Sequence, residues 1–254
     1  LLLKQLRFYP ILQLIVIIIF ISISYFLFSI ARRSEQNQVW AGLAKETAHQ
    51  LGTPLSSILA WVELLKINGQ EDIADEINKD AIRLNTIAKR FSKIGSIPNL
   101  EMADVNSVVV ESINYLKKRT SNKVIFFVNK PDYAVNIPLS IDLFEWVIEN
   151  ICKNAVDAMD GKGSITIDII DELENIVIDI TDTGKGIPRS KHKTIFNPGV
   201  TSKKRGWGLG LSLAKRIVEE VHLGKIFVKS SVINKGTTFR IVLKKKKLLE
   251  NYGE

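Results

Sequence analysis

The feature that most constrains the fold is a long apolar segment near the N-terminus. No charged residue occurs from Phe8 to Ala31, and the stretch from Ile11 to Phe28 consists almost entirely of Ile, Leu, Val and Phe. Roughly 20 helical residues at about 1.5 Å each match a hydrocarbon core about 30 Å thick. A cleavable signal peptide is the competing interpretation, but its apolar region is usually about 7–15 residues long and no small-residue cleavage site follows here. The segment therefore predicts a transmembrane helix over residues 8–31.

Residues 32–97 have the periodicity of two amphipathic helices separated by a turn at Asn68-Gly69. On each side of the turn, one stripe recurs at steps of three and four residues. The stripe positions are Leu43, Thr47, Leu51, Leu55, Ile58, Val62 and Leu65, and then Ile73, Ile77, Leu84, Ala88, Phe91 and Ile94. Such helices form an antiparallel hairpin, and one hairpin cannot bury both stripes fully. We therefore expect a homodimer in which two hairpins form a four-helix bundle.

A histidine on the first helix of this hairpin has the surroundings of a reactive group. His49 and Thr53 are four residues apart, so they share a helix face away from the apolar stripe. Pro54 lacks the N–H that would bond to the Gln50 carbonyl, so the helix should bend just after the histidine. A neutral imidazole is a nucleophile and titrates near pH 6.5. His49 is therefore the candidate nucleophile of the chain.

After a linker near residues 98–103, residues 104–247 alternate helices and strands. The expected helices are 104–118, 141–159 and 209–222, and the expected strands are 124–128, 165–170, 176–181, 226–230 and 238–243. Helices that segregate onto one face of a mixed sheet give an α/β sandwich, so the chain as a whole belongs to the α+β class. Residues 248–254 are expected to form a tail.

Polar residues in the predicted sandwich have the spacing of a ligand site. Asn150 and Asn154 share a helix face, where a side-chain carbonyl can reach Mg²⁺. Asp182 ends a strand, and Gly184 and Gly186 follow it, so the backbone can approach a flat ring closely.

A glycine-rich run follows further along the chain. Gly206-Trp207-Gly208-Leu209-Gly210 leads into an amphipathic helix, whose N–H groups can bind anionic oxygens. The loop before it holds Phe196 and the cations Lys203, Lys204 and Arg205. No Gly-x-x-x-x-Gly-Lys-Ser/Thr run occurs, which excludes a Walker-type site.

The order of these motifs resembles that of bacterial two-component sensor histidine kinases, from the last transmembrane helix to the C-terminus. The stretches that carry the resemblance are His49 to Leu55 (HQLGTPL), Asn154 to Met159 (NAVDAM), Asp182 to Gly186 (DTGKG) and Gly206 to Gly210. The resemblance implies a HisKA-type dimerisation and phosphoacceptor hairpin. It also implies a GHKL-type ATP-binding domain of the Bergerat fold, which histidine kinases share with gyrase, Hsp90 and MutL.

The resemblance further implies a reaction and a set of ligands. The γ-phosphoryl of Mg-ATP would pass to His49, and then to a receiver-domain aspartate of a separate response regulator. Asn154 would bind Mg²⁺, Asp182 would accept a hydrogen bond from the adenine amino group, and Thr237 would support that contact. The other candidate nucleotide-binding residues are Asn150, Asp157, Gly184, Gly186, Phe196, Lys203, Gly206, Gly208 and Gly210.

Gln50 departs from the pattern of that family, in which an acidic residue usually follows the histidine. Its amide oxygen can fix the imidazole tautomer but cannot take up a proton at neutral pH. Thr53 matches the position that relatives use to orient water for dephosphorylation. One alternative is therefore a phosphatase-dominant or scaffolding partner with weak autokinase activity. A second is a GHKL-type ATPase like gyrase or Hsp90, but those enzymes carry Glu where this chain has Asn150.

Charge and spacing bear on partners and location. The net charge of +8 comes from Lys and Arg that are scattered apart from the runs 203–205 and 244–247, with no interleaved aromatic residues, so we expect no nucleic-acid partner. Basic residues flank the apolar segment on both sides and do not orient it. Dependence on ATP places the catalytic part in the cytoplasm, and the anchor in the bacterial inner (cytoplasmic) membrane. Only 17 residues separate Ala31 from His49, so a signal would pass directly down a continuous helix.

Overall fold

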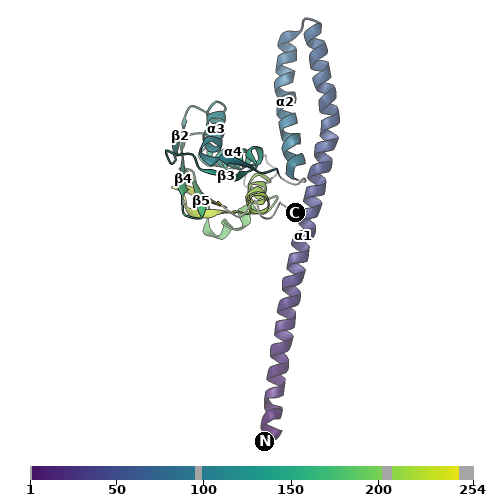
Figure 1. Ribbon diagram of the computed structural model, residues 1–254, viewed down its shortest axis with the longest axis vertical. Helices are drawn as coiled ribbons and strands as arrows, with labels where there is room; N and C mark the ends of the chain where they lie inside the picture. The colour runs from purple at the N-terminus through teal and green to yellow at the C-terminus, as the bar shows by residue number, and fades with distance from the viewer. Residues whose placement is uncertain (1, 95–98, 202–207, 246–254) are drawn as a thin grey trace. The chain divides into compact units, whose positions relative to one another are not determined.

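The computed structural model describes residues 2–94, 99–201 and 208–245 (Figure 1). The chain divides into two compact units, Leu1–Ile97 and Pro98–Glu254. The first unit is helical, and the second combines a sheet with helices.

Two helices make up the first unit. α1 (Leu2–Ile67) is one uninterrupted helix of 66 residues, and α2 (Glu71–Ile94) returns antiparallel to its C-terminal part (Figure 1). The turn between them depends on Gly69, whose φ of +75° is easily adopted only by glycine. The Gly69 N–H donates to the Lys66 carbonyl at 3.0 Å and so caps α1. Glu71 and Asp72 in the first turn of α2 interact favourably with the helix dipole.

The N-terminal part of α1 contains a segment that is long and apolar enough to cross a membrane. It runs from Tyr9 to Ser29, 21 residues, with a mean hydropathy of 2.7. None of this segment is buried within the unit, in contrast to the core helix of a soluble protein.

Among its described side chains, the hairpin buries one set of apolar positions and leaves others exposed. Leu55 and Val62 of α1 are buried, and so are Ala74, Ala81 and Ala88 of α2, at intervals of seven residues on both helices. The small alanine side chains let the helices approach closely. A second set, also at seven-residue intervals, stays exposed on the same helices: Leu51, Ile58, Ile77 and Leu84. We call this set the open stripe.

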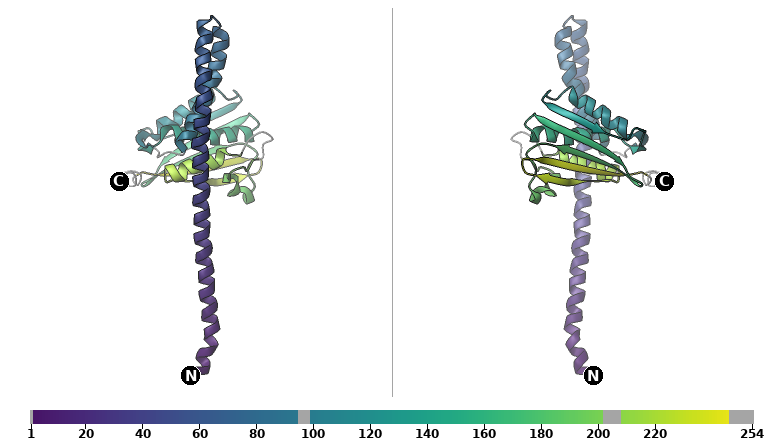
Figure 2. Two further views of the ribbon diagram at one scale, coloured as in Figure 1. Left: turned by 90° about the vertical axis from the view of Figure 1, so that its right-hand side faces the viewer. Right: turned by 90° about the vertical axis from the view of Figure 1, so that its left-hand side faces the viewer.

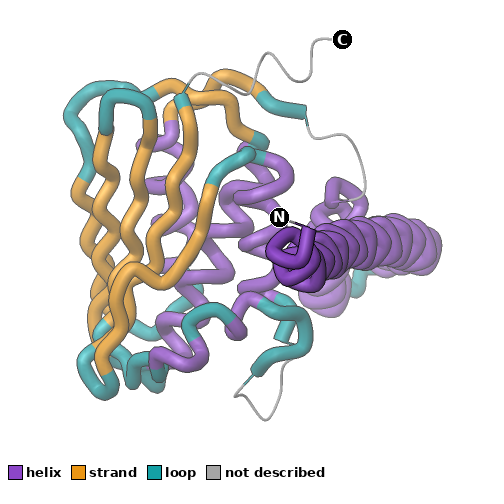
Figure 3. The backbone as a smooth tube through the Cα atoms, turned by 90° about the horizontal axis from the view of Figure 1, so that it is seen from below, coloured by secondary structure: helices purple, strands orange, loops and turns teal. Residues whose placement is uncertain are grey.

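The second unit contains a five-stranded mixed sheet covered by helices on one face (Figures 2 and 3). Its strand order is β2-β4-β5-β7-β6, with β2 parallel to β4 and all other neighbours antiparallel. The strands are β2 (Val124–Asn129), β4 (Gly163–Asp171), β5 (Asn175–Asp182), β6 (Lys225–Val232) and β7 (Gly236–Lys244). The helices are α3 (Val105–Lys117), α4 (Ile141–Ala158), α5 (Gly210–Arg216) and the π-helix η3 (Ile217–Val221). The α/β arrangement predicted for this unit is confirmed.

α4 lies at the centre of the core. Its fully buried side chains Phe144, Ile148 and Ile151 belong to the same cluster as Ile167 of β4 and Ile178 of β5. Because α4 is fixed along most of its length, the polar residues on it have defined positions.

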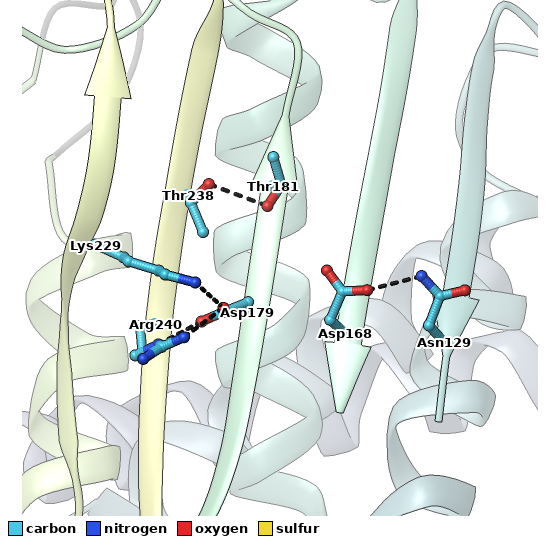
Figure 4. Close-up of polar contacts among 7 residues, drawn as sticks. All are labelled: Asn129, Asp168, Asp179, Thr181, Lys229, Thr238 and Arg240. Carbon is cyan, nitrogen blue, oxygen red and sulfur yellow. Dashed lines mark hydrogen bonds and ion pairs between the residues drawn. The ribbon is translucent and has the colours of Figure 1, made fainter. Parts of the chain in front are cut away.

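The opposite face of the sheet carries polar pairs that bridge neighbouring strands (Figure 4). The buried Asp179 carboxylate accepts hydrogen bonds from Arg240 Nε and Nη2 (2.7 and 2.8 Å) and from Lys229 Nζ (2.7 Å). Burial raises the pKa of the Asp179 carboxyl, but the bonds from Arg240 and Lys229 outweigh it and hold that pKa below its ordinary value. The pairs therefore hold β5, β6 and β7 together on the face that carries no helices.

Two short strands lie outside the expected pattern. β1 (Glu101–Asp104) begins in the predicted linker and pairs antiparallel with β3 (Asn136–Leu139). Asp104 ends β1 and caps α3, because its carboxylate accepts the N–H groups of Asn106 and Ser107, both at 3.2 Å. The short 3₁₀ helices η1 (Arg189–Lys191) and η2 (Thr194–Phe196) are also not among the predicted elements. The helix predicted over 209–222 is confirmed only in part, because its last turns are the π-helix η3.

His222 joins the end of this π-helix to the start of α4. Its ring is fully buried, and Nε2 accepts the N–H of Ser140, the N-cap residue of α4, at 3.1 Å. Nδ1 lies 3.0 Å from the Ile217 carbonyl, so it carries the proton and the imidazole is neutral. Burial lowers the pKa of His222 from 6.5 to about 4, against a smaller opposing effect of the Ile217 carbonyl.

Stability of the second unit should therefore fall with acid. Above pH 6.5 His222 is neutral in both states; below it, the unfolded chain binds a proton that the folded chain binds only near pH 4. This difference in pKa lowers the free energy of unfolding by about 3 kcal/mol as the pH falls from 6.5 to about 4. Amide exchange of α4 in the full chain, corrected for intrinsic rates, measures the loss. His222→Gln should flatten this slope between pH 6.5 and 4.5, and equal slopes in both proteins would contradict the assignment.

Candidate functional site

The site begins with two half-buried asparagines, Asn150 and Asn154, on α4. Gly210, the first residue of α5, packs against them: a Cβ on Gly210 would lie 3.3 Å from Asn150 Oδ1 and 3.8 Å from Asn154 Nδ2. Asn150 Nδ2 is buried and has no hydrogen-bond partner within the parts of the chain that the structure describes. A buried amide without a partner is costly unless a ligand satisfies it. Asp157, about one turn after Asn154 on the same helix, is exposed.

Asp182 lies at the end of β5, opposite Thr237 of β7. Its carboxylate is almost fully buried, and Oδ1 accepts the Gly184 N–H at 2.7 Å. Burial raises the pKa of the Asp182 carboxyl, although the backbone N–H groups of Gly184 and Thr237 oppose that rise. The result is an oriented hydrogen-bond acceptor in a largely dry position.

Residues 183–187 form a loop that lies close to two neighbouring elements. At its start, a Cβ on Gly184 would lie 2.7 Å from the Ala158 carbonyl, which accepts the Lys185 N–H at 3.0 Å. At its centre, Gly186 has a φ of +73°, and a Cβ there would lie 2.3 Å from the Val232 carbonyl. Only glycine fits at Gly184 and Gly186. The loop is therefore held between the C-terminal end of α4 and the turn that connects β6 to β7.

Thr237 and Ser231 complete this end of the site. Thr237 is buried, and its Oγ1 lies 2.9 Å from Ser231 Oγ. Ser231 Oγ also accepts the Ile187 N–H at 2.8 Å. The sequence patterns do not indicate Ser231, because it belongs to no motif; only its register opposite Thr237 on β6 could have pointed to it.

The glycine-rich segment at the other end is closed at its base. The Gly199 N–H donates to the Gly208 carbonyl at 3.2 Å, and a Cβ on Gly208 would lie 2.6 Å from Gly199 C. Phe196 is buried, and its ring packs edge-to-face on Phe239 at 6.2 Å, so it supports this base from within the core. Lys203 and Gly206 lie outside the described residues, as do Lys204 and Arg205.

The candidate nucleophile belongs to the first unit. His49, Gln50 and Thr53 are all in the helical backbone of α1, and the Gln50 side chain is exposed. The side chains of His49 and Thr53 lie outside the described residues. Their roles stay predictions.

In the second unit, the predicted residues make a site with two chemically different ends. A buried carboxylate and close-packed glycine backbone lie at the C-terminal end of α4. Asn150 and Asn154 lie one to two turns earlier, beside the start of α5 and its preceding glycines. This arrangement suits an elongated ligand with a flat, hydrogen-bonding end and an anionic end.

Comparison with known proteins agrees with that geometry. Residues 140–247 match the family described as histidine kinase-, DNA gyrase B-, and HSP90-like ATPase. The chain is 30% identical over 223 residues to the sensor histidine kinase ZraS of Salmonella typhi, which covers 84% of this chain and 47% of ZraS. It is 30% identical over 242 residues to sporulation kinase D of Bacillus subtilis (strain 168), covering 89% of this chain and 47% of that kinase. The chain thus spans about half the length of these relatives.

A solved structure shares the fold. The histidine kinase ThkA, determined in complex with response regulator protein TrrA, superposes with a TM-score of 0.56 at 20% sequence identity. The match covers 87% of this chain and 66% of that one.

Proposed function

We propose that the protein is a histidine autokinase. The premise is that residues 140–247 match histidine kinase-, gyrase B- and HSP90-like ATPases, in a chain that is homologous to sensor histidine kinases. It would transfer the γ-phosphoryl group of Mg-ATP to His49. The phosphoryl group would then pass to an aspartate in the receiver domain of a separate response regulator. The complex of ThkA with its response regulator supports that class of partner.

The observation that carries the proposal is the placement of Asp182 relative to the asparagines of α4. Asp182 offers a buried carboxylate acceptor beside the glycine backbone at Gly184 and Gly186, which suits the amino edge and flat face of adenine. Asn150 and Asn154 lie about 6 to 12 Å of helix before the end of α4 at Ala158. ATP would therefore lie with its base at that end and its phosphates beside Gly208 and Gly210.

The asparagines also suit the metal that accompanies ATP. Amide carbonyl oxygens are hard ligands of the kind that Mg²⁺ accepts together with phosphate oxygens and water. We assign the metal ligand to Asn154. Asn150 would donate to a phosphate oxygen through its Nδ2, which has no partner among the described residues. When bound, the ion would neutralise charge on the β- and γ-phosphates. Asp157, Lys203, Gly206 and Phe196 stay predicted contacts or supports.

At His49, the lone pair of a neutral ring nitrogen would attack the γ-phosphorus. The new P–N bond would form as the bond between the γ-phosphorus and the β,γ-bridging oxygen breaks and ADP leaves, and the proton on the other ring nitrogen would then pass to water. Gln50 can hold the second ring nitrogen through its amide oxygen, but it does not take up a proton. We assign Thr53 to phosphatase activity, in which it would orient the water that dephosphorylates the regulator.

Two features of the first unit support the assembly. The open stripe of Leu51, Ile58, Ile77 and Leu84 continues the seven-residue spacing of the buried positions, so a second copy would cover it in a four-helix bundle. The segment Tyr9–Ser29 is the proposed transmembrane helix, which anchors the dimer in the inner membrane with the ATP-binding unit in the cytoplasm.

The proposal is tested by incubating the full chain, in detergent, with γ-labelled ATP and Mg²⁺. We expect a protein-bound label that acid removes and alkali does not, as for a P–N bond. Gln50 cannot take up a proton at neutral pH, and this favours one alternative, a phosphatase-dominant partner. That protein would bind ATP tightly, gain little label and dephosphorylate a labelled regulator. Release of inorganic phosphate without a protein-bound phase would instead indicate a GHKL-type ATPase.

A further inference from the structure

The turn between β6 and β7 is packed onto the loop that carries the candidate base-binding residues. The Asn234 N–H donates to the Lys185 carbonyl at 2.9 Å. Two glycines show how close the approach is: a Cβ on Gly186 would lie 2.3 Å from the Val232 carbonyl, and one on Gly236 would lie 1.9 Å from the Asp182 carbonyl. Residues 231–236, which we call the brace, therefore hold the loop 183–187 by backbone contact. Ser231 is the residue of the brace that adds side-chain contacts.

The Ser231 hydroxyl connects three backbone segments. It accepts the Ile187 N–H at 2.8 Å, lies 2.9 Å from Thr237 Oγ1 and lies 3.2 Å from the Gly236 carbonyl. A serine hydroxyl has one proton to donate and two lone pairs to accept with. If its proton goes to Gly236, then Thr237 must donate to Ser231; if it goes to Thr237, the Thr237 proton is released for another acceptor. Ser231 thus sets the hydrogen-bonding state of Thr237.

Thr237 is in turn connected to Asp182. The two residues pair across β5 and β7, and the Thr237 backbone N–H bonds to the Asp182 carboxylate. The path from Ile187 through Ser231 and Thr237 to Asp182 runs along one side of the loop. On the other side the loop bonds to Asp182 and to Ala158 of α4 through the Gly184 and Lys185 N–H groups, and the Thr183 hydroxyl accepts the Ser164 N–H of β4 at 3.1 Å.

We propose that Ser231 is a positioning residue for the nucleotide base: its hydroxyl holds the end of the loop at Ile187 and orients Thr237, so that the Asp182 carboxylate meets the adenine amino group. The inference rests on the proposed ATP site. It assigns to the β6–β7 turn a part in base selectivity that depends on a single hydroxyl group. Val232 and Ile233 at the tip of the brace are exposed, so the brace is held by these inner contacts rather than by burial of its tip.

The test compares the binding of two nucleotides to the full chain in detergent. ATP and ITP differ at C6, where ITP has a carbonyl in place of the amino group that Asp182 would recognise. Ser231→Ala should weaken ATP binding about tenfold, because the Ile187 N–H, the Thr237 hydroxyl and the Gly236 carbonyl each lose a hydrogen-bond partner. It should weaken ITP binding only about twofold, so selectivity falls. Ser231→Thr keeps the hydroxyl on a strand position and should restore both affinities.

Two controls separate this role from general stability. Ser230→Ala, at the exposed neighbouring position, should leave both affinities unchanged. The thermal midpoint without nucleotide reports folding. If Ser231→Ala lowers the midpoint and weakens ATP and ITP equally, or leaves both affinities as in wild type, the inference is wrong while the ATP site stands. If the wild-type chain binds neither nucleotide, the proposed function itself is wrong, and the inference with it.

Discussion

Replacing His49 by Gln should abolish the acid-labile label that wild-type protein acquires from γ-labelled ATP. Glutamine has no nucleophilic ring nitrogen, so loss should be at least about a thousandfold, the scale on which removing a nucleophile acts in enzymes. ATP affinity should be unchanged, because the proposed nucleotide site lies in the other unit. Phosphorimaging after denaturing electrophoresis, paired with an ATP-binding measurement on the same preparation, gives both values.

The two other histidines of the chain provide the control. His222 is fully buried with both ring nitrogens hydrogen-bonded, so it is closed to a phosphoryl group in the folded protein. His192 bonds through Nε2 to the Ile187 carbonyl at 3.0 Å, and a glutamine amide can replace that contact. His192→Gln should therefore retain most of the label. Label that survives in His49→Gln but disappears in His192→Gln would overturn the assignment of the acceptor.

Replacing Asp182 by Asn should weaken ATP binding about a hundredfold. The carboxylate accepts the N–H groups of Gly184 and Thr237, and in our proposal it also accepts the adenine amino group. An amide has one acceptor oxygen, and its NH₂ group would face donors. Because burial raises the pKa of this carboxyl, ATP affinity of wild type should also fall as the pH approaches that raised value from above. Calorimetric titration at several pH values measures both effects.

Asp179 is a matched control on the same strand. It is as buried as Asp182, at 4% against 3% exposed, but it lies on the helix-free face with Arg240 and Lys229 (Figure 4). Asp179→Asn should lower stability, because two cations lose their counter-charge, while ATP affinity stays within about twofold. Equal loss of ATP affinity in both variants would mean that Asp182 acts through the fold, and the base-contact assignment would fail.

Periodicity in the sequence predicts most of the elements, and the exceptions have physical reasons. The helices and strands of residues 105–244 have strong patterns and clear breaks, and they appear within a few residues of the predicted bounds. β1 and β3 are four residues each, too short to show alternation, and they exist because they pair with each other. In α2 the buried face is built on alanines. Ala74 and Ala81 are too small to stand out in the hydrophobic pattern, which is dominated by Ile77 and Leu84, both of them exposed.

The candidate site divides in the same way. Asp182 and the α4 asparagines belong to short local motifs, so a single sequence indicates them. Ser231 and His222 act through partners 6 to 82 positions away, Thr237 and Ser140 among them, and no local pattern encodes such contacts. Their importance depends on strand register and on how η3 meets α4.

The helical backbone of α1 continues without a break from Leu2 to Ile67, so each position on it has a defined rotation about the helix axis relative to the others. From Ser29, the last residue of the apolar segment, to His49, α1 is about 30 Å long and turns by about 100° per residue. On the proposed topology, a rotation or a translation of α1 at the membrane would be transmitted to His49, because the helix between them is continuous. Seven residues inserted between Ser29 and His49 would return His49 to within about 20° of its original position around the helix axis, whereas two would rotate it by about 160°. The direction that His49 faces is thus decided at the membrane surface.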